Sequence, residues 1–271
     1  MVKAKPDFKR MLLRLPHSPN DYGAVALIAE LASLLSADLI GTYVEDEILR
    51  SLVDLPNARE FRAGCWQPLN SNQLTLDLAS ASREAERRFL QIAGRYRPSF
   101  QVVENASAAV REAGNDDIIV VIEPKSPIER TTRQFSELLD DAYRSTSSIL
   151  WVPRETRRFA GPVVVIANGP RDRCISAAIT IAASAKERLI LVPSVRSMES
   201  LAIALEWART AGVSTTSTDA VFHQDRLLLP AHIRAGLLIA GRERVMRPGY
   251  LPQVPTLLLS SNLRPATAGP E

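Results

Sequence analysis

The strongest constraint on the fold is an alternation of strand-like and helix-like segments that occurs twice along the chain. Strand candidates are short apolar runs, and helix candidates carry apolar residues three and four positions apart. In the first half the strand candidates are residues 11–15, 39–44, 100–103, 118–122 and 148–152. In the second half they are residues 163–167, 189–192, 214–218, 237–240 and 256–259. Because helix-sized segments separate the strands, the pattern predicts parallel sheets with helical crossovers.

The helix candidates fill the intervals between these strands. The longest covers residues 74–95, with Leu78 and Phe89 on one face and Arg83 and Arg87 on the other. The remaining helix candidates are residues 24–35, 106–113, 133–144, 175–185, 200–210 and 222–234, the last interrupted by Pro230. Residues 46–72 show neither period, and we expect an irregular stretch there.

The doubled alternation predicts an α/β protein with two tandem doubly wound parallel-sheet, Rossmann-like domains, the second of them shortened. We expect domain 1 over residues 1–153, a charged linker over 154–161 and domain 2 over 162–271. The offset between the copies falls from about 151 residues at the first strand to 119 at the fourth (237 − 118). The second copy is therefore about 30 residues shorter, and the deficit falls after its second strand.

Composition excludes several classes of protein. The net charge of +3 does not argue for nucleic acid, and no apolar run reaches the length of about 18 residues that a membrane span needs. The first ten residues lack the apolar core of a signal peptide. Cys65 and Cys174 form neither a disulfide framework nor a metal-ligand spacing. We therefore expect a cytoplasmic protein with no nucleic-acid partner, no membrane insertion and no metal site.

The order and lengths of the elements resemble the tandem form of the universal stress protein family. The family's nucleotide-binding members carry a G-x2-G-x9-G-[ST] motif after the fourth strand, whose glycines let backbone amides approach phosphates. Aligned on the fifth strand, the motif positions of the first copy are Ile122, Lys125, Phe135 and Ser136. All three glycines are replaced, so we expect no ATP site in the first copy and a helix N-cap at Ser136.

The second copy keeps part of the family's site. Its fourth strand ends at Gly241, in register with the first motif glycine, but Arg244 stands at the second motif position. After the first strand, where the family carries an acidic residue, the second copy has Asn168. At the position of this acidic residue the first copy has Pro16. The resemblance implies that ATP or another adenine nucleotide, if bound at all, binds in the second copy only, with no other cofactor expected. The candidate cofactor-binding residues are Asn168, Gly169, Val192, Gly241, Arg242 and Arg244.

Basic residues follow the fourth strand of both copies, at the edge where α/β folds bind ligands. They are Lys125, Arg130 and Arg133 in the first copy and Arg242, Arg244 and Arg247 in the second. These side chains either hold a phosphate or carboxylate or form a solvated surface. The motifs G-x-S-x-G, G-x-x-x-x-G-K-[ST], H-E-x-x-H and G-x-G-x-x-G are absent from the sequence, and we assign no catalytic residue.

The resemblance implies a non-enzymatic, stress-associated regulatory or small-ligand-sensing protein. Two alternatives stay open: a nucleotide-binding or nucleotide-hydrolysing member of the wider nucleotide α-hydrolase-like group, and an interaction module for a transporter or kinase. Family subunits associate through the fifth strand, so residues 149–151 are expected to pack against residues 257–259. The chain would then be an intramolecular pseudo-dimer, and further homodimerisation is left open.

Overall fold

The computed structural model describes most of the chain, namely residues 8–15, 19–45, 49, 51–52, 55–62, 64–103, 110–124, 126–156, 159–167, 172–193, 198–218, 221–223, 226–228, 234–242 and 253–260. The first half supplies five strands to the main sheet: β1 (Arg10–Arg14), β2 (Asp38–Val44), β5 (Ser99–Val103), β6 (Asp117–Ile122) and β7 (Ser148–Val152). The second half supplies β8 (Val163–Ala167), β9 (Leu189–Pro193), β10 (Thr215–Ser217), β13 (Leu237–Gly241) and β14 (Thr256–Leu259). All ten strands lie within about one residue of the predicted ranges.

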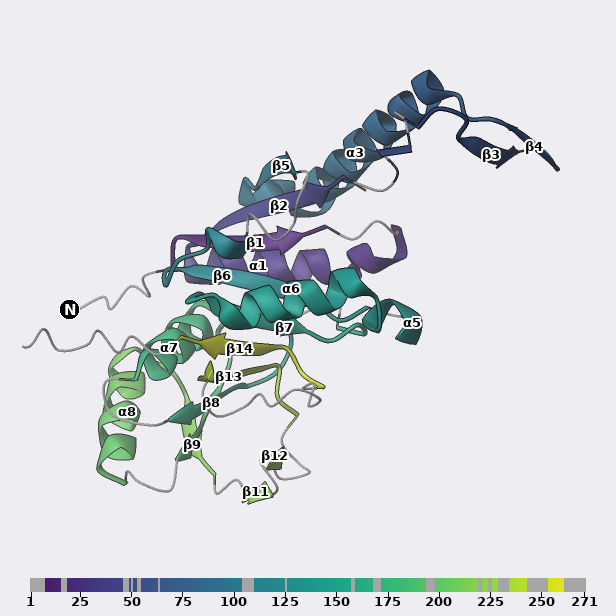
Figure 1. Cartoon of the computed structure of the whole chain (residues 1–271). Helices are drawn as coiled ribbons and strands as arrows, with labels where there is room; N and C mark the ends of the chain where they lie inside the picture. The colour runs from purple at the N-terminus through teal and green to yellow at the C-terminus, as the bar shows by residue number, and fades with distance from the viewer. Residues whose placement is uncertain are drawn as a thin grey trace, which may run out of the picture.

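These ten strands form one continuous sheet in the order β10-β9-β8-β13-β14-β7-β6-β1-β2-β5 (Figure 1). Within each half the order is third, second, first, fourth and fifth strand, and every neighbouring pair is parallel. The predicted fold class, two doubly wound parallel sheets in tandem, is confirmed. The two sheets are continuous with one another because β7 and β14 pair edge to edge, antiparallel.

The pairing of β7 with β14 has the register of a local two-fold axis. Leu150 lies opposite Leu257, with the pairs Ile149–Leu258 and Trp151–Thr256 on either side. Exchanging the two strands maps one flanking pair onto the other. Every residue of both strands is buried, so the joint lies inside the hydrophobic core.

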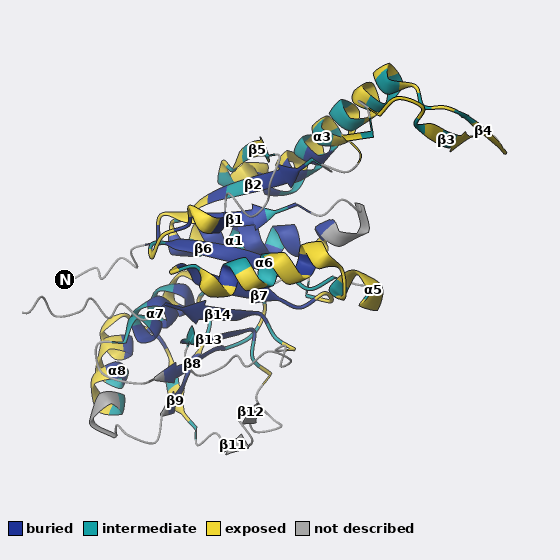
Figure 2. Cartoon of the chain, in the orientation of Figure 1, coloured by how far each residue is buried: buried dark blue, intermediate teal, exposed yellow. Residues whose placement is uncertain are grey.

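Helices cover both faces of the sheet (Figures 1 and 2). Buried residues of α1 (Val25–Leu35), α3 (Ser71–Ala93), α7 (Arg173–Ala185) and α8 (Met198–Thr210) form one apolar cluster with one face of the strands. Buried residues of α6 (Arg133–Arg144) belong to the cluster on the opposite face. Helices α1 and α7, from different halves, pack against each other, so apolar contacts cross the joint outside the strands as well.

The strand registers show where the second half is shorter. Ile40 of β2 pairs with Ser99 of β5, 59 residues later (99 − 40). Ile190 of β9 pairs with Thr216 of β10, only 26 residues later (216 − 190). The deficit falls after the second strand, as the sequence predicts.

The extra residues of the first half form an arm. A hairpin of β3 (Arg59–Arg62) and β4 (Cys65–Pro68) leads into α3, whose buried residues Ala85, Phe89 and Ala93 all lie in its carboxyl-terminal half. Phe89 packs against β2 at Gly41, where an added Cβ would lie 2.6 Å from the phenyl ring. This contact anchors α3, and the hairpin lies beyond its free amino-terminal end (Figure 1).

Two local expectations are wrong. Residues 46–72 contain this hairpin and are not wholly irregular, because Asn57 and Gly64 adopt positive φ and let the chain turn. The predicted helix over 222–234 is in its described part an antiparallel hairpin of β11 (Val221–His223) and β12 (Arg226–Leu228). Pro230 lacks an N–H, which leaves too short a run for a stable helix. Half of the predicted helix over 106–113, residues 106–109, lies outside the described residues.

Candidate functional site

Ligands of doubly wound folds bind beyond the carboxyl ends of the strands, where the strand order reverses. In this chain the reversal lies between β1 and β6 in the first half and between β8 and β13 in the second. Because β7 and β14 are antiparallel, these two carboxyl edges lie on opposite sides of the ten-stranded sheet. The two candidate sites are therefore separate.

Arg14, the last residue of β1, is the central cation at the first-half edge. Its side chain is half-buried, and its Nη2 donates a hydrogen bond to Oε1 of Gln134 at 3.2 Å. Arg14 lines a cavity of about 20 Å³, enough for one or two waters. The other walls of the cavity are mostly apolar: Leu12, Thr42, Val44, Val110, Ile119, Val120 and Leu138.

The charge of Arg14 has no acidic partner among the described residues. Burial lowers its pKa, and no carboxylate counters this effect. Arg130, in the segment that follows β6, differs, because its Nη2 lies 3.0 Å from a carboxylate oxygen of Glu123. A desolvated guanidinium facing only a neutral amide favours an anion from solution.

The predicted basic residues of the first half turn out to be largely neutralised. Arg130 pairs with Glu123, and Arg133 pairs with Glu137 on the surface of α6 at 2.7 Å. Lys125 lies outside the described residues. Arg14 is not among the residues predicted from the sequence. It could have been recognised as a charged residue within the apolar run 11–15, because strand residues two apart share one face and Arg14 therefore shares a face with the apolar Leu12.

The family's motif positions are filled in the first half. Ile122 ends β6, and Phe135 is buried against the sheet in the first turn of α6. The prediction that Ser136 caps this helix is wrong. Thr132 is the N-cap, its hydroxyl accepting a hydrogen bond from the Phe135 amide at 3.4 Å, so Ser136 lies inside the helix. The N-cap lies four residues before the position that the motif alignment gives (136 − 132).

In the second half the structure describes three of the six candidate residues. Val192 is fully buried in β9, Gly241 ends β13, and Arg242 follows it. Asn168, Gly169 and Arg244, like the neighbouring Arg247, lie outside the described residues. The structure therefore leaves the second-half site as a sequence prediction.

Arg242 makes a contact that its sequence position does not suggest. Its two terminal nitrogens donate four hydrogen bonds to backbone carbonyls at the end of α6 and just beyond it. These are Ser145 at 2.7 Å, Ser147 at 2.6 Å, Ala142 at 3.1 Å and Tyr143 at 2.6 Å. Burial lowers the pKa of Arg242, and a cation at a helix C-terminus is stabilised by the helix dipole. Arg242 thus ties the second half to the first.

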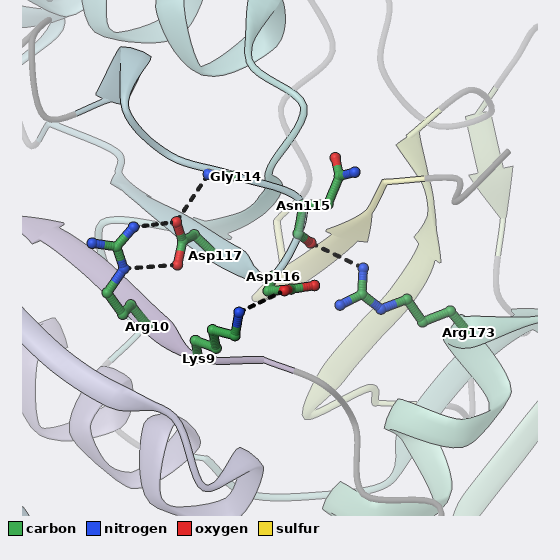
Figure 3. A network of polar contacts seen from close by, with 7 residues as sticks. All are labelled: Lys9, Arg10, Gly114, Asn115, Asp116, Asp117 and Arg173. Carbon is green, nitrogen blue, oxygen red and sulfur yellow. Dashed lines mark hydrogen bonds and ion pairs between the residues drawn. The ribbon is translucent and has the colours of Figure 1, made fainter. Parts of the chain in front are cut away.

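A second polar network lies at the opposite edge of the first half (Figure 3). Arg10 binds both carboxylate oxygens of Asp117, at 2.9 and 2.6 Å, and the Gly114 amide donates to the same carboxylate at 2.9 Å. Beside it, Nη1 of Arg173, the first residue of α7, donates to the Asn115 carbonyl at 3.0 Å. This network is a second polar link between the halves.

The Asp117 network predicts a pH dependence of stability. Burial raises the pKa of Asp117, but the hydrogen bonds from Arg10 and Gly114 outweigh it, and the pKa is lowered overall. A lowered folded-state pKa stabilises the fold above the unfolded value of about 3.9, and this contribution is lost as pH falls through the folded-state pKa. We expect Asp117→Asn to cost about 2 kcal/mol at pH 7 and much less near pH 2, measured by urea unfolding. A cost independent of pH would contradict this assignment.

The cysteines differ in exposure, and the described acidic residues form no metal-binding cluster. Cys174 is buried in α7 and burial raises the pKa of its thiol, whereas Cys65 is exposed in β4. Within the described ranges no three His, Cys, Asp or Glu side chains lie where they could share a metal ion. No helix in the described part of the chain is long and apolar enough to span a bilayer.

Comparisons with known proteins bear on the fold. No protein-family model matches the sequence, and no curated protein matches it. A universal stress protein from Archaeoglobus fulgidus DSM 4304 superposes with a TM-score of 0.61 at 12% identity, over 93% of this chain and 96% of that chain. The functionally unknown protein PA1789 from Pseudomonas aeruginosa PAO1 gives 0.47 at 15% identity, over 95% and 94%. The cytoplasmic domain of a prokaryotic cation chloride cotransporter gives 0.47 at 11%, over 93% and 96%. At these identities the first match shows a universal stress protein-like fold and nothing finer.

Proposed function

We propose that this chain is a non-enzymatic regulatory protein that senses a small anionic molecule at the carboxyl edge of its first half. The observation that carries the proposal is Arg14, a half-buried cation that lines a cavity at the ligand-binding edge of the fold. The stress-associated role rests on the resemblance to the universal stress protein family.

The chemistry of the site favours a carboxylate or a phosphate. A guanidinium presents paired N–H donors that match two oxygens of either group, and partial desolvation strengthens such a pair. The cavity of about 20 Å³ beside it does not hold a nucleotide base. We therefore assign the anionic group to Arg14 and a small apolar group to the cavity.

ATP is a poor candidate for the first half. Phe135 is buried at the third motif position, where the family's glycine would leave room for backbone amides to approach phosphate. A flexible lysine at position 125 does not replace a fixed cradle of amides. A nucleotide, if the protein binds one, belongs to the second half, around Asn168, Gly169, Val192 and Gly241. Arg242 is engaged with α6 and contributes there only if it exchanges partners.

Ligand-dependent thermal stability tests the role of Arg14. Inorganic phosphate and a panel of small mono- and dicarboxylates serve as probes for the full-length protein, for Arg14→Gln and for the control Arg133→Gln. A ligand that binds the folded state at 100 times its Kd adds about 2.7 kcal/mol. We expect at least one probe to raise the Tm of the wild type and of the control, and to leave Arg14→Gln unchanged.

The same experiment separates ligand binding from a structural role. Without added anion, Arg14→Gln is expected to melt no lower than the wild type, because it removes a desolvated charge that lacks a counter-ion. A lower Tm for Arg14→Gln in anion-free buffer, or equal stabilisation of all three proteins by every active probe, would contradict the proposal. A panel in which no probe acts would contradict it too.

A further inference from the structure

The β3–β4 hairpin presents an exposed aromatic pair. Phe61 and Trp66 lie directly opposite each other on the two strands, their ring centroids 5.5 Å apart in an edge-on arrangement. Phe61 is 62% exposed and Trp66 is 65% exposed. Figure 2 shows the hairpin as an exposed projection beyond the end of α3. Two adjacent, largely exposed aromatic rings are typical of an interaction surface.

The hairpin also lacks a third strand among the described residues. In the described part of the chain β3 and β4 pair only with each other. An isolated two-stranded hairpin is at best marginally stable in water, and three or more strands with an apolar face are usually needed. An added strand at the free edge would supply the missing pairing and would place a further side chain beside the aromatic pair.

We propose that the occupant is a second copy of this chain, whose β3 pairs antiparallel with β3 about a two-fold axis through Phe61. The backbone supports this arrangement. The Leu69 amide donates to the Ala58 carbonyl at 2.8 Å, so positions 58, 60 and 62 direct their backbone groups toward β4. Because the directions alternate, the N–H and C=O groups of Arg59 and Phe61 point to the outer edge of the hairpin, where a further strand can pair with them.

Charge selects one register from those that the backbone allows. A two-fold axis at Glu60 would oppose two glutamates, and an axis at Arg62 would oppose two arginines. An axis at Phe61 places the two phenylalanines opposite each other and pairs Glu60 with Arg62 of the second copy, twice. Opposite charges across adjacent strands stabilise a sheet and like charges destabilise it. The sequence of β3, Arg-Glu-Phe-Arg, is therefore self-complementary in this register.

The resulting four-stranded sheet carries one aromatic row across its width, in the order Trp66, Phe61, Phe61 and Trp66. Glu60 and Arg62, which already lie 3.9 Å apart within one hairpin, gain partners on the other face. Two short hairpins bury less surface than a standard interface of about 1,600 Å². We therefore expect a reversible dimer with a Kd on the order of tens of micromolar.

Charge reversal tests the register in the full-length protein. Sedimentation velocity between about 2 and 200 µM should show the wild type shifting from monomer to dimer. Glu60→Arg alone, or Arg62→Glu alone, should raise the dimer Kd at least about tenfold, because like charges then face each other. An equimolar mixture of the two variants should restore dimerisation as a heterodimer. The control Asp140→Arg changes an exposed carboxylate on α6 by the same charge and should dimerise like the wild type.

Disulfide trapping tests the axis directly. In a Cys65→Ser background, Phe61→Cys places two thiols on a hydrogen-bonded pair with Cα atoms about 5.5 Å apart, within disulfide range. Gln67→Cys in the same background lies three strand spacings from its copy and should not cross-link. A monomer at every concentration would overturn the proposal. So would a mixture that fails to associate, or cross-linking of the Gln67→Cys variant without cross-linking of the Phe61→Cys variant.

Discussion

Replacing Trp151 with aspartate is expected to lower the free energy of unfolding by at least about 4 kcal/mol. Trp151 is fully buried in β7, opposite Thr256 of β14, and belongs to the same apolar cluster as Phe135 of α6. The substitution removes a large apolar side chain and buries a carboxylate without a partner, and each change alone costs several kcal/mol. The effect should be global, since the strand joins the halves.

Guanidinium unfolding with matched variants measures this effect. Trp207→Asp makes the same chemical change on α8, where the side chain is 43% exposed, and should cost less than about 1 kcal/mol. Trp151→Phe should lie between the wild type and Trp151→Asp. An unchanged free energy of unfolding for Trp151→Asp would count decisively against a joint that depends on the fifth strands.

Replacing Arg242 with alanine is expected to cost about 2–4 kcal/mol, the second-largest effect. The substitution removes four hydrogen bonds to carbonyls at the end of α6 and the favourable charge at that helix terminus. Arg242→Lys keeps the charge but loses the planar fork, and should recover less than half of the loss. Urea unfolding at neutral pH gives the comparison.

The control for Arg242 is Arg209→Ala on the surface of α8, where Arg209 pairs with Glu206 at 2.9 Å and is largely exposed. An exposed pair of this kind contributes at most about 1 kcal/mol. If Arg242→Ala proves as harmless as Arg209→Ala, the tie to α6 is wrong. Arg242 would then return to the role that the sequence suggests, in a ligand site of the second half.

The sequence predicts the sheet well because each strand is a local feature. The run 118–122 is continuous and β-branched, and the structure buries nearly all of it as β6. The helix over 133–144 has the predicted bounds because Thr132 caps it and polar residues end it. The repeat then limits the topology, since parallel strands need long crossovers.

The candidate site is less predictable because it depends on contacts between distant segments. Arg242 binds carbonyls about 100 residues earlier in the chain, and no local pattern encodes such a pairing. The prediction of an N-cap at Ser136 is wrong because it rests on the spacing of the family's motif. The start of the helix depends instead on the residue that caps it, which is Thr132. The environment of Arg14 is formed by Gln134 and by cavity walls from distant segments, so the sequence around Arg14 does not predict it.

A small anion bound by the first half through Arg14, in place of a nucleotide, should be detectable in the protein as purified. Native mass spectrometry of freshly purified full-length protein, beside Arg14→Gln, tests this binding most directly. We expect a co-purifying adduct lighter than an adenine nucleotide on the wild type, which is lost in the variant. An adenine nucleotide held equally by both proteins would belong to the second half. The lighter adduct would then decide whether Arg14 binds an anion. A nucleotide lost with Arg14→Gln, or spectra of both proteins without the lighter adduct, would contradict the binding of a small anion at Arg14.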